Sequence, residues 1–224
     1  MKIIAHIHNN YIEKFGIPRQ SGLVNSVSST IIFEPEYRDE NAVRGLEGFS
    51  YIWILWQFSK NVGKEWSPMV RPPRLGGNKK VGVFATRSPF RVNPIGMSSV
   101  KLDRIELTEQ GPVLYVDGAD LLDGTPIYDI KPYIPEIDSH PEARAGFAEM
   151  TKEYKAEVII PEELCQQISS NQRQTIIDIL SQDPRPGYQE DEERIYGMKY
   201  GNLEIKFRSD GEKLIVCAIE KGLK

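Results

Sequence analysis

Short apolar segments separated by turn signals fill the middle of this chain and constrain its fold more than any other feature. Strand-like runs recur as VGVFAT, SSVKLDRIEL, PVLYVDG and IYDIKPYI, and the turn signals QGP and LDGTP stand between them. Short strands at this hairpin-like spacing favour a mostly antiparallel sheet or a barrel.

The N-terminal part adds further strands to this sheet. KIIAHIH alternates, TIIFEP is β-branched and aromatic, and SYIWILWQF is almost entirely apolar. The last run is too short for a membrane span and predicts a buried central strand with Trp53 and Trp56 in the core. DENAVRGLEGF predicts a short helix that ends near Gly48.

The composition changes after residue 135, where the polar stretch EIDSHPEARAGFAEM predicts a linker. Beyond it AEVII predicts a strand, Pro161 suits the first position of a helix, and the helical stretch must end by Asp183 because Pro184 follows. The remaining strands pair around an Asp210-Gly211 turn. The expected fold is mainly β, with a barrel-like domain at 1–140 and a small α+β domain at 150–224.

Several function classes find no support in the sequence. The 224 residues carry a net charge of -4 and are 40% apolar, and no window is apolar enough for a membrane span. The dinucleotide fingerprint GxGxxG, the P-loop, HExxH and GxSxG are all missing. Two cysteines and three histidines give neither a disulfide framework nor metal-ligand spacing. We therefore expect a cytoplasmic protein without a metal.

Basic residues are concentrated in one region in spite of the negative net charge. Between Lys60 and Arg91 the only acidic residue is Glu65. The cations of this run are Lys60, Lys64, Arg71, Arg74, Lys79, Lys80, Arg87 and Arg91. The run predicts either a local patch for an anionic partner or simply a solvated face.

Four polar segments marked by proline or glycine interrupt the apolar framework. They are IPRQSG (17–22), RPPRLGGN (71–78), TRSPFRVNPIGM (86–97) and DLLDGTPIYDIKPY (120–133). Arginine forks such as Arg19 and Arg87 suit a carboxylate, Asp120 and Asp123 suit hydroxyls or an ammonium, and Met97 suits a flat ring. The segments predict a preorganised ligand pocket, and four ordinary turns are the alternative.

The same segments carry a resemblance to a known family. FATRSPFRVNPIGMS, PRQSGLV, AVRGLEGFSYIWIL, VRPPRLGGN, DLLDGTPIYDIKPY and QDPRPGY occur in the order found in the TrmO family, also called TsaA-like or YaeB-like. The resemblance covers nearly the whole chain. It implies a dimeric tRNA methyltransferase that binds S-adenosylmethionine on the loops of a β-barrel. Its target is the exocyclic amine of threonylcarbamoyladenosine, just 3′ of the anticodon.

The resemblance also implies functional residues. The expected cofactor contacts are Pro18, Arg19, Gln20, Ser59, Lys60, Arg87, Met97, Asp120, Leu121, Leu122 and Asp123. Two positions depart from the family pattern, because relatives usually have histidine in place of Ser59 and proline in place of Val92. The first departure weakens the assignment of Ser59 and Lys60, and the second predicts a slightly less rigid loop.

Catalysis requires that a deactivated amine lose its proton. Arg87 is expected to stabilise developing negative charge, with Asp129, Tyr133 and Asp123 as candidate bases, although Asp129 also suits a purely structural acceptor. Expected contacts to the tRNA anticodon loop are Arg71, Arg74, Arg91, Asp183, Arg185 and Tyr188. A non-catalytic cofactor- or RNA-binding module, and a barrel methyltransferase for a small molecule, are the alternative functions.

Overall fold

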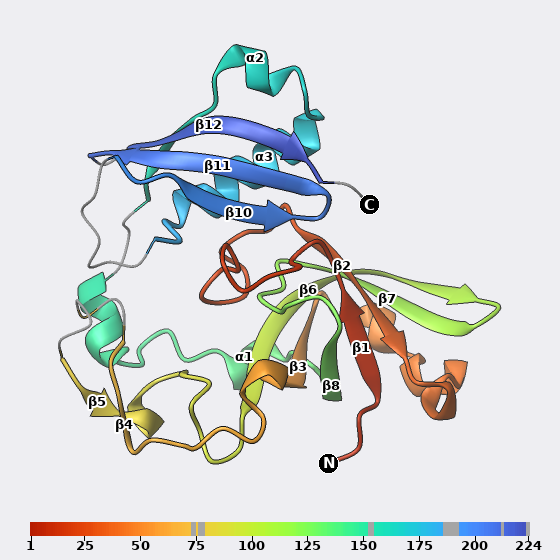
Figure 1. Ribbon diagram of the computed structural model, residues 1–224. Coiled ribbons are helices and arrows are strands. Elements are labelled where there is room, and N and C mark those ends of the chain that lie inside the picture. The colour runs from red at the N-terminus through yellow and green to blue at the C-terminus, as the bar shows by residue number, and fades with distance from the viewer. Residues whose placement is uncertain (73–74, 76–78, 152–154, 186–192, 212, 223–224) are drawn as a thin grey trace.

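The computed structural model describes the chain except residues 73–74, 76–78, 152–154, 186–192, 212 and 223–224. Figure 1 shows a barrel built by the N-terminal part of the chain and a small sheet with helices, built by the C-terminal part, packed above it. In the described part of the chain, no helix has the length and apolarity needed to cross a membrane.

Six antiparallel strands close the barrel in the order β1-β2-β7-β6-β3-β8. Their bounds are Ala5–His8 (β1), Ser28–Phe33 (β2), Tyr51–Gln57 (β3), Ile95–Thr108 (β6), Gly111–Asp117 (β7) and Thr125–Pro132 (β8). Alternate side chains of each strand point inward and form one apolar core, as the period of two requires. The predicted antiparallel barrel is confirmed.

The central strand behaves largely as its apolar composition predicts. Trp56 lies in the core at 7% exposure. Trp53 points to the other face of β3, where it is half-buried and its indole nitrogen donates to Asp138 Oδ2 at 3.0 Å. The core prediction therefore holds for Trp56 and not for Trp53. Side chains alternate between the two faces of a strand, so residues three positions apart face opposite sides.

Two local predictions differ from the structure. The expected helix before Gly48 is replaced by two 3-10 turns, η2 (Glu40–Val43) and η3 (Leu46–Gly48). VGVFAT contains only the two-residue strand β5 (Val81–Gly82), which pairs with β4 (Met69–Val70), and then the 3-10 turn η6 (Val83–Ala85). The pairing with β4 ends at Gly82, and Phe84 in η6 is 75% exposed. The β propensity of VFA alone therefore did not extend the strand.

The remaining short elements lie in the connections between strands. They are the 3-10 turns η1 (Pro35–Tyr37), η4 (Ser59–Asn61) and η7 (Gly146–Thr151) and the single-turn helix α1 (Pro135–Asp138).

The C-terminal unit consists of a four-stranded sheet and two helices. The strands β9 (Glu157–Ile159), β10 (Tyr196–Tyr200), β11 (Leu203–Asp210) and β12 (Lys213–Lys221) lie in the order β10-β11-β12-β9. The helices are α2 (Glu162–Cys165) and α3 (Ser170–Ser181). Ser169 and Gln172 form a capping box at the start of α3. The predicted single helical stretch is thus two helices, and Pro161 precedes the first turn of α2 as its N-cap.

Residues 9–27 connect β1 to β2, and their buried apolar side chains pack into the core of the C-terminal unit and not into the barrel core. We call these residues the β1–β2 segment. Tyr11, Val24 and Val27 are buried in the second apolar core together with side chains of α3 and of β10 to β12. Figure 1 shows this loop directly beside β10. The C-terminal unit therefore shares a core with a segment from the start of the chain.

Candidate functional site

A cavity of about 470 Å³ lies at the barrel end where β3 finishes and β6 begins. Its lining comes from four separate stretches of the chain. The lining residues are Lys14, Ile17, Pro18, Arg19, Gln20, Trp56, Gln57, Phe58, Ser59, Lys60, Asn61, Thr86, Arg87, Pro89, Arg91, Ile95, Gly96, Met97, Ser98, Asp120, Leu122 and Thr125. The volume is that of a small-molecule or cofactor site.

The indole of Trp56 forms the deep part of this cavity. A Cβ atom on Gly96 would lie 2.2 Å from the Trp56 ring, so only glycine lets the two strands approach this closely. The indole nitrogen of Trp56 donates to Ser98 Oγ at 3.0 Å, and the Ser98 hydroxyl donates to Asp120 Oδ1 at 2.6 Å. These bonds fix the position of the Asp120 carboxylate.

Asp120 is the only carboxylate among the described lining residues. Burial raises its pKa, and this effect outweighs the hydrogen bond from Ser98 and the nearby charge of Arg87, which lower it. Asp120 is therefore a better proton acceptor than an ordinary aspartate, provided that it is ionised.

The rest of the lining is rich in cations. Lys14, Arg19, Lys60, Arg87 and Arg91 all contribute to it. Burial lowers the pKa of Lys14, and the neighbouring Lys64 and Lys60 lower it further. Lys14 was not predicted as a site residue, although it lies only three residues before IPRQSG. One carboxylate among five cations suits a ligand with anionic groups and at least one cationic or hydroxyl group.

Arg87 is held by the segment that carries the PRQ motif. Its guanidinium donates to the side-chain oxygen of Gln20, and the Gln20 amide donates to the backbone carbonyl of Arg19 at 2.5 Å. Two predicted cofactor loops, far apart in sequence, therefore meet at this point of the cavity.

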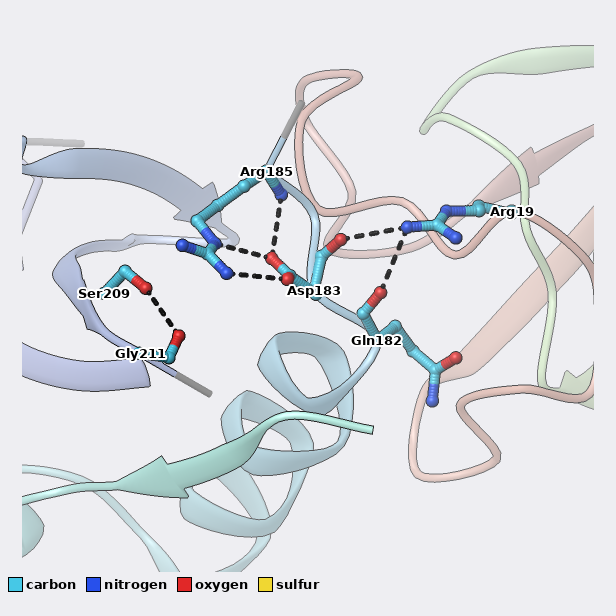
Figure 2. Close-up of polar contacts among 6 residues, drawn as sticks. All are labelled: Arg19, Gln182, Asp183, Arg185, Ser209 and Gly211. Carbon is cyan, nitrogen blue, oxygen red and sulfur yellow. Dashed lines mark hydrogen bonds and ion pairs between the residues drawn. The ribbon is translucent and has the colours of Figure 1, made fainter. Parts of the chain in front are cut away.

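The Arg19 side chain binds the C-terminal unit. Its guanidinium donates to the backbone carbonyls of Gln182 at 3.4 Å and of Asp183 at 3.1 Å, at the end of α3 (Figure 2). Arg19 was expected to hold a ligand carboxylate with this fork. In the structure one nitrogen of this fork, Nη2, donates to both protein carbonyls.

Family models cover almost the whole chain. The model of the tRNA-methyltransferase O N-terminal domain matches residues 6–139, and the TrmO C-terminal domain matches residues 150–222. The chain belongs to the TrmO family. The resemblance inferred from its motifs is confirmed.

Individual TrmO relatives and a solved structure agree with this assignment. The tRNA (adenine(37)-N6)-methyltransferase of Escherichia coli (strain K12) is 40% identical over 225 residues, covering 97% of this chain and 96% of the relative. A putative S-adenosylmethionine-dependent methyltransferase of Pseudomonas aeruginosa (strain PAO1) is 37% identical over 222 residues, covering 95% and 93%. A crystal structure of TrmO from Pseudomonas aeruginosa aligns with a TM-score of 0.77 at 30% identity, covering 97% of both chains.

Most of the residues carried over from the TrmO motifs meet in the cavity. Those that line it are Pro18, Arg19, Gln20, Ser59, Lys60, Arg87, Met97, Asp120, Leu122 and, from the expected RNA contacts, Arg91. The Arg91 guanidinium donates to the carbonyls of Val83 at 3.1 Å and Thr86 at 2.7 Å, so it also holds its own loop.

Two residues of the TrmO motif DLLD are not among the described lining residues. Leu121 is fully buried in the barrel core. Asp123 accepts from the backbone nitrogen of Asn9 at 3.1 Å and lies 3.4 Å from His8 Nδ1. Successive residues of this loop point in different directions, so Leu121 and Asp123 contact the barrel and not the cavity. Both contacts stabilise the barrel around the site.

The candidate bases Asp129 and Tyr133 lie elsewhere on the barrel. Asp129 lies opposite Leu55, on the outward face of the sheet, and pairs with Lys131 at 2.9 Å. It lines a second cavity, of about 540 Å³. Tyr133 packs against the rings of Tyr51 and Trp53. Neither residue is among the described lining of the first cavity. Asp129 points outward from β8, and Tyr133 follows β8 beside the start of β3, whereas the cavity lies where β3 ends.

The expected RNA contacts are only partly described. Arg71 is exposed, whereas Arg74 and Tyr188 lie outside the described residues. Arg185 forms two bonds of 2.8 Å with the carboxylate of Asp183, and both side chains are largely buried, at 13% and 14% exposure (Figure 2). This ion pair gives the turn after α3 a fixed shape.

Proposed function

We propose that this chain transfers a methyl group from S-adenosylmethionine to the exocyclic N6 amine of the adenine beside the tRNA anticodon, in its threonylcarbamoylated form. The observation that carries the proposal is the cavity, where the PRQ, TRSPFR and DLLD segments of a TrmO chain meet around one carboxylate and five cations. The names of the relatives support the reaction and the methyl donor.

The donor set fits the cofactor chemically. S-adenosylmethionine carries a carboxylate, an ammonium, ribose hydroxyls and a purine ring, and when bound it supplies an activated methyl group on a sulfonium. The Arg87 guanidinium suits the carboxylate, Asp120 suits an ammonium or a hydroxyl, and Met97 and Leu122 offer apolar contact to a ring. The protein mainly has to align the reacting atoms.

Asp120 is our candidate for the group that accepts the proton of the N6 amine. It is the only carboxylate among the lining residues that the structure describes, and burial raises its pKa. The bound sulfonium would supply the methyl group, and the Asp120 carboxylate would accept the proton that the N6 amine loses when it is methylated.

Cations near the cavity support binding of an anticodon loop. An unpaired loop base can leave its stack at low cost and enter a pocket, while phosphates bind arginine and lysine. Lys14, Lys60 and Arg91 lie at the cavity, and Arg71 follows on the same basic run. We assign cofactor binding to residues 1–140 and tRNA binding to residues 150–224, in a cytoplasmic homodimer.

The direct test combines binding with product analysis. Purified protein is titrated with S-adenosylmethionine by calorimetry, and is then incubated with tRNA from cells that lack this protein. Nucleoside mass spectrometry should detect one added methyl group on threonylcarbamoyladenosine, and none on tRNA without the threonylcarbamoyl group. Cofactor binding without methyl transfer would identify a non-catalytic module. Transfer to a small molecule but not to tRNA would also contradict the proposal.

A further inference from the structure

We propose that Arg19 is a positioning residue. Through Arg19, the turn after α3 controls the cofactor site, although Gln182 and Asp183 of this turn are not among the described residues that line the site. This inference rests on the proposed function, because it concerns the same cavity. It assigns to the C-terminal unit a role in binding the methyl donor, in addition to any role in binding RNA.

The packing of the β1–β2 segment is the first observation. This segment supplies Pro18, Arg19 and Gln20 to the cavity, yet its apolar side chains Phe15 and Ile17 pack against the core of the C-terminal unit. At Gly16, where φ is +90°, an added Cβ would lie 2.4 Å from Met198 Sδ on β10. The backbone immediately before the PRQ motif therefore rests directly on the C-terminal sheet.

Hydrogen bonds fix the segment at both ends. The backbone nitrogen of Gly201 donates to the Asn10 carbonyl at 2.8 Å, and that of Lys199 donates to Glu13 Oε1 at 2.8 Å. Near the other end the Ser26 hydroxyl donates to Asp178 Oδ2 at 2.6 Å. Between these ends, Arg19 binds the carbonyls of Gln182 and Asp183.

The partners of Arg19 have a well-defined geometry. Carbonyls at the C-terminal end of a helix lack intrahelical donors and carry partial negative charge, so they favour an arginine. Asp183 has φ of +46° and is the only non-glycine residue with positive φ in the described part of the chain. This conformation, held by the Asp183–Arg185 ion pair, sets the direction of the Asp183 carbonyl (Figure 2).

A short series of contacts leads from this turn into the cavity. The Arg19 carbonyl accepts from the Gln20 amide, and the Gln20 oxygen accepts from Arg87. Arg87 is the residue to which we assign the cofactor carboxylate. A displaced α3 turn should therefore release Arg19 and Gln20 and lower cofactor affinity, although neither Gln182 nor Asp183 is among the described lining residues.

The test uses substitutions on both sides of the contact. Arg19→Met keeps the aliphatic stem and removes the donors. Asp183→Val introduces a β-branched residue that disfavours positive φ, whereas Asp183→Asn tolerates it. Ser26→Ala is the matched control, since it removes a hydrogen bond between the same segment and α3, and Ser26 is not among the described lining residues. Calorimetric titration of each variant with S-adenosylmethionine measures affinity, and thermal unfolding measures stability.

We expect Arg19→Met and Asp183→Val to weaken cofactor binding about tenfold, which corresponds to about 1.4 kcal/mol. Asp183→Asn and Ser26→Ala should stay within about twofold of the original protein, and Arg19→Lys should recover part of the loss, because lysine also donates to carbonyls at a helix end. If Arg19→Met weakens binding while Asp183→Val does not, Arg19 contacts the cofactor directly and the positioning role is wrong. Equal losses in Ser26→Ala would also contradict it.

A second measurement needs no cofactor. Amide hydrogen exchange of residues 17–22 in the free protein should become faster in Arg19→Met and Asp183→Val and should be unchanged in Ser26→Ala. The Gly22 amide, which donates to the Gly118 carbonyl at 2.8 Å, is a suitable probe. Faster exchange in a protein that binds no S-adenosylmethionine would refute the proposed function and leave the positioning role intact. Unchanged exchange in both variants would refute the positioning role.

Discussion

Asp120 combines a functional position with an energetic cost. Its pKa is raised because a partly buried carboxylate loses hydration that Ser98 and Arg87 do not fully replace. The folded protein therefore binds this proton more tightly than the unfolded chain does. This contribution to stability is present at low pH and is lost as the pH rises from about 3.9, the ordinary value of aspartate, through the raised pKa of the folded protein.

The first prediction concerns Asp120→Asn. The amide keeps the shape and can accept the Ser98 hydrogen bond, but it removes the buried charge. We expect a thermal midpoint a few degrees higher at pH 7 and methyl transfer reduced by at least about a hundredfold. Thermal unfolding at pH 4 and pH 7 is the check, because the gain in stability should shrink at the lower pH. A variant with full activity would exclude Asp120 as the proton acceptor.

The second prediction concerns Gly96→Ala. The new Cβ would overlap the Trp56 ring, so the strand or the indole must move, at a cost of about 1–3 kcal/mol in the free energy of unfolding. Cofactor affinity should fall as well, because both residues line the cavity. Gly48→Ala is the control, since nothing lies within 4 Å of its added Cβ. Denaturant titration that finds equal stabilities for the two variants would contradict this packing.

Single residues show what a sequence can and cannot predict about a site. The fork of Arg19 was recognised as a binder of oxygen atoms, but its partners are backbone carbonyls more than 160 positions later in the chain. Asp129, Tyr133 and Asp123 were predicted as the nearest candidate bases in sequence. Asp129 lies on the outer face of β8, and that direction depends on a register that sequence alone does not fix.

At the scale of elements, patterns with a clear physical cause were predictable. PVLYVDG (β7), the NLEIKF run (β11) and the apolar run of β3 all became strands, although β3 buries only one of its two faces. The short helix before Gly48 was wrong, and of the strand at VGVFAT only Val81–Gly82 formed, because local propensity alone is weak.

The third prediction concerns the capping box of α3. Ser169→Ala removes the hydroxyl that accepts from the backbone nitrogen of Gln172. This change should lower the free energy of unfolding by about 1 kcal/mol. Cofactor affinity should be nearly unchanged, because the start of α3 is remote from the turn that binds Arg19. Chemical denaturation and cofactor titration of this one variant separate the two effects. A large loss of affinity would mean that the whole helix, and not its last turn, positions Arg19.

At the scale of the whole molecule, the two cores are joined by one segment. The fourth prediction is that the protein unfolds in a single transition. A chain limited to residues 1–140 should expose Tyr11, Val24 and Val27, aggregate, and bind S-adenosylmethionine poorly. Calorimetry of the full chain and light scattering of the fragment are the measurements. A soluble, monomeric fragment with full cofactor affinity would show that the barrel is self-sufficient.

The β1–β2 segment also has a consequence for protein synthesis. It is synthesised before its core partners on α3, β10 and β11. The barrel can close while the chain is still growing, whereas the PRQ motif can be ordered only after the C-terminal unit has emerged. We therefore expect the proposed methyl-donor site to form only after the C-terminal unit has been synthesised.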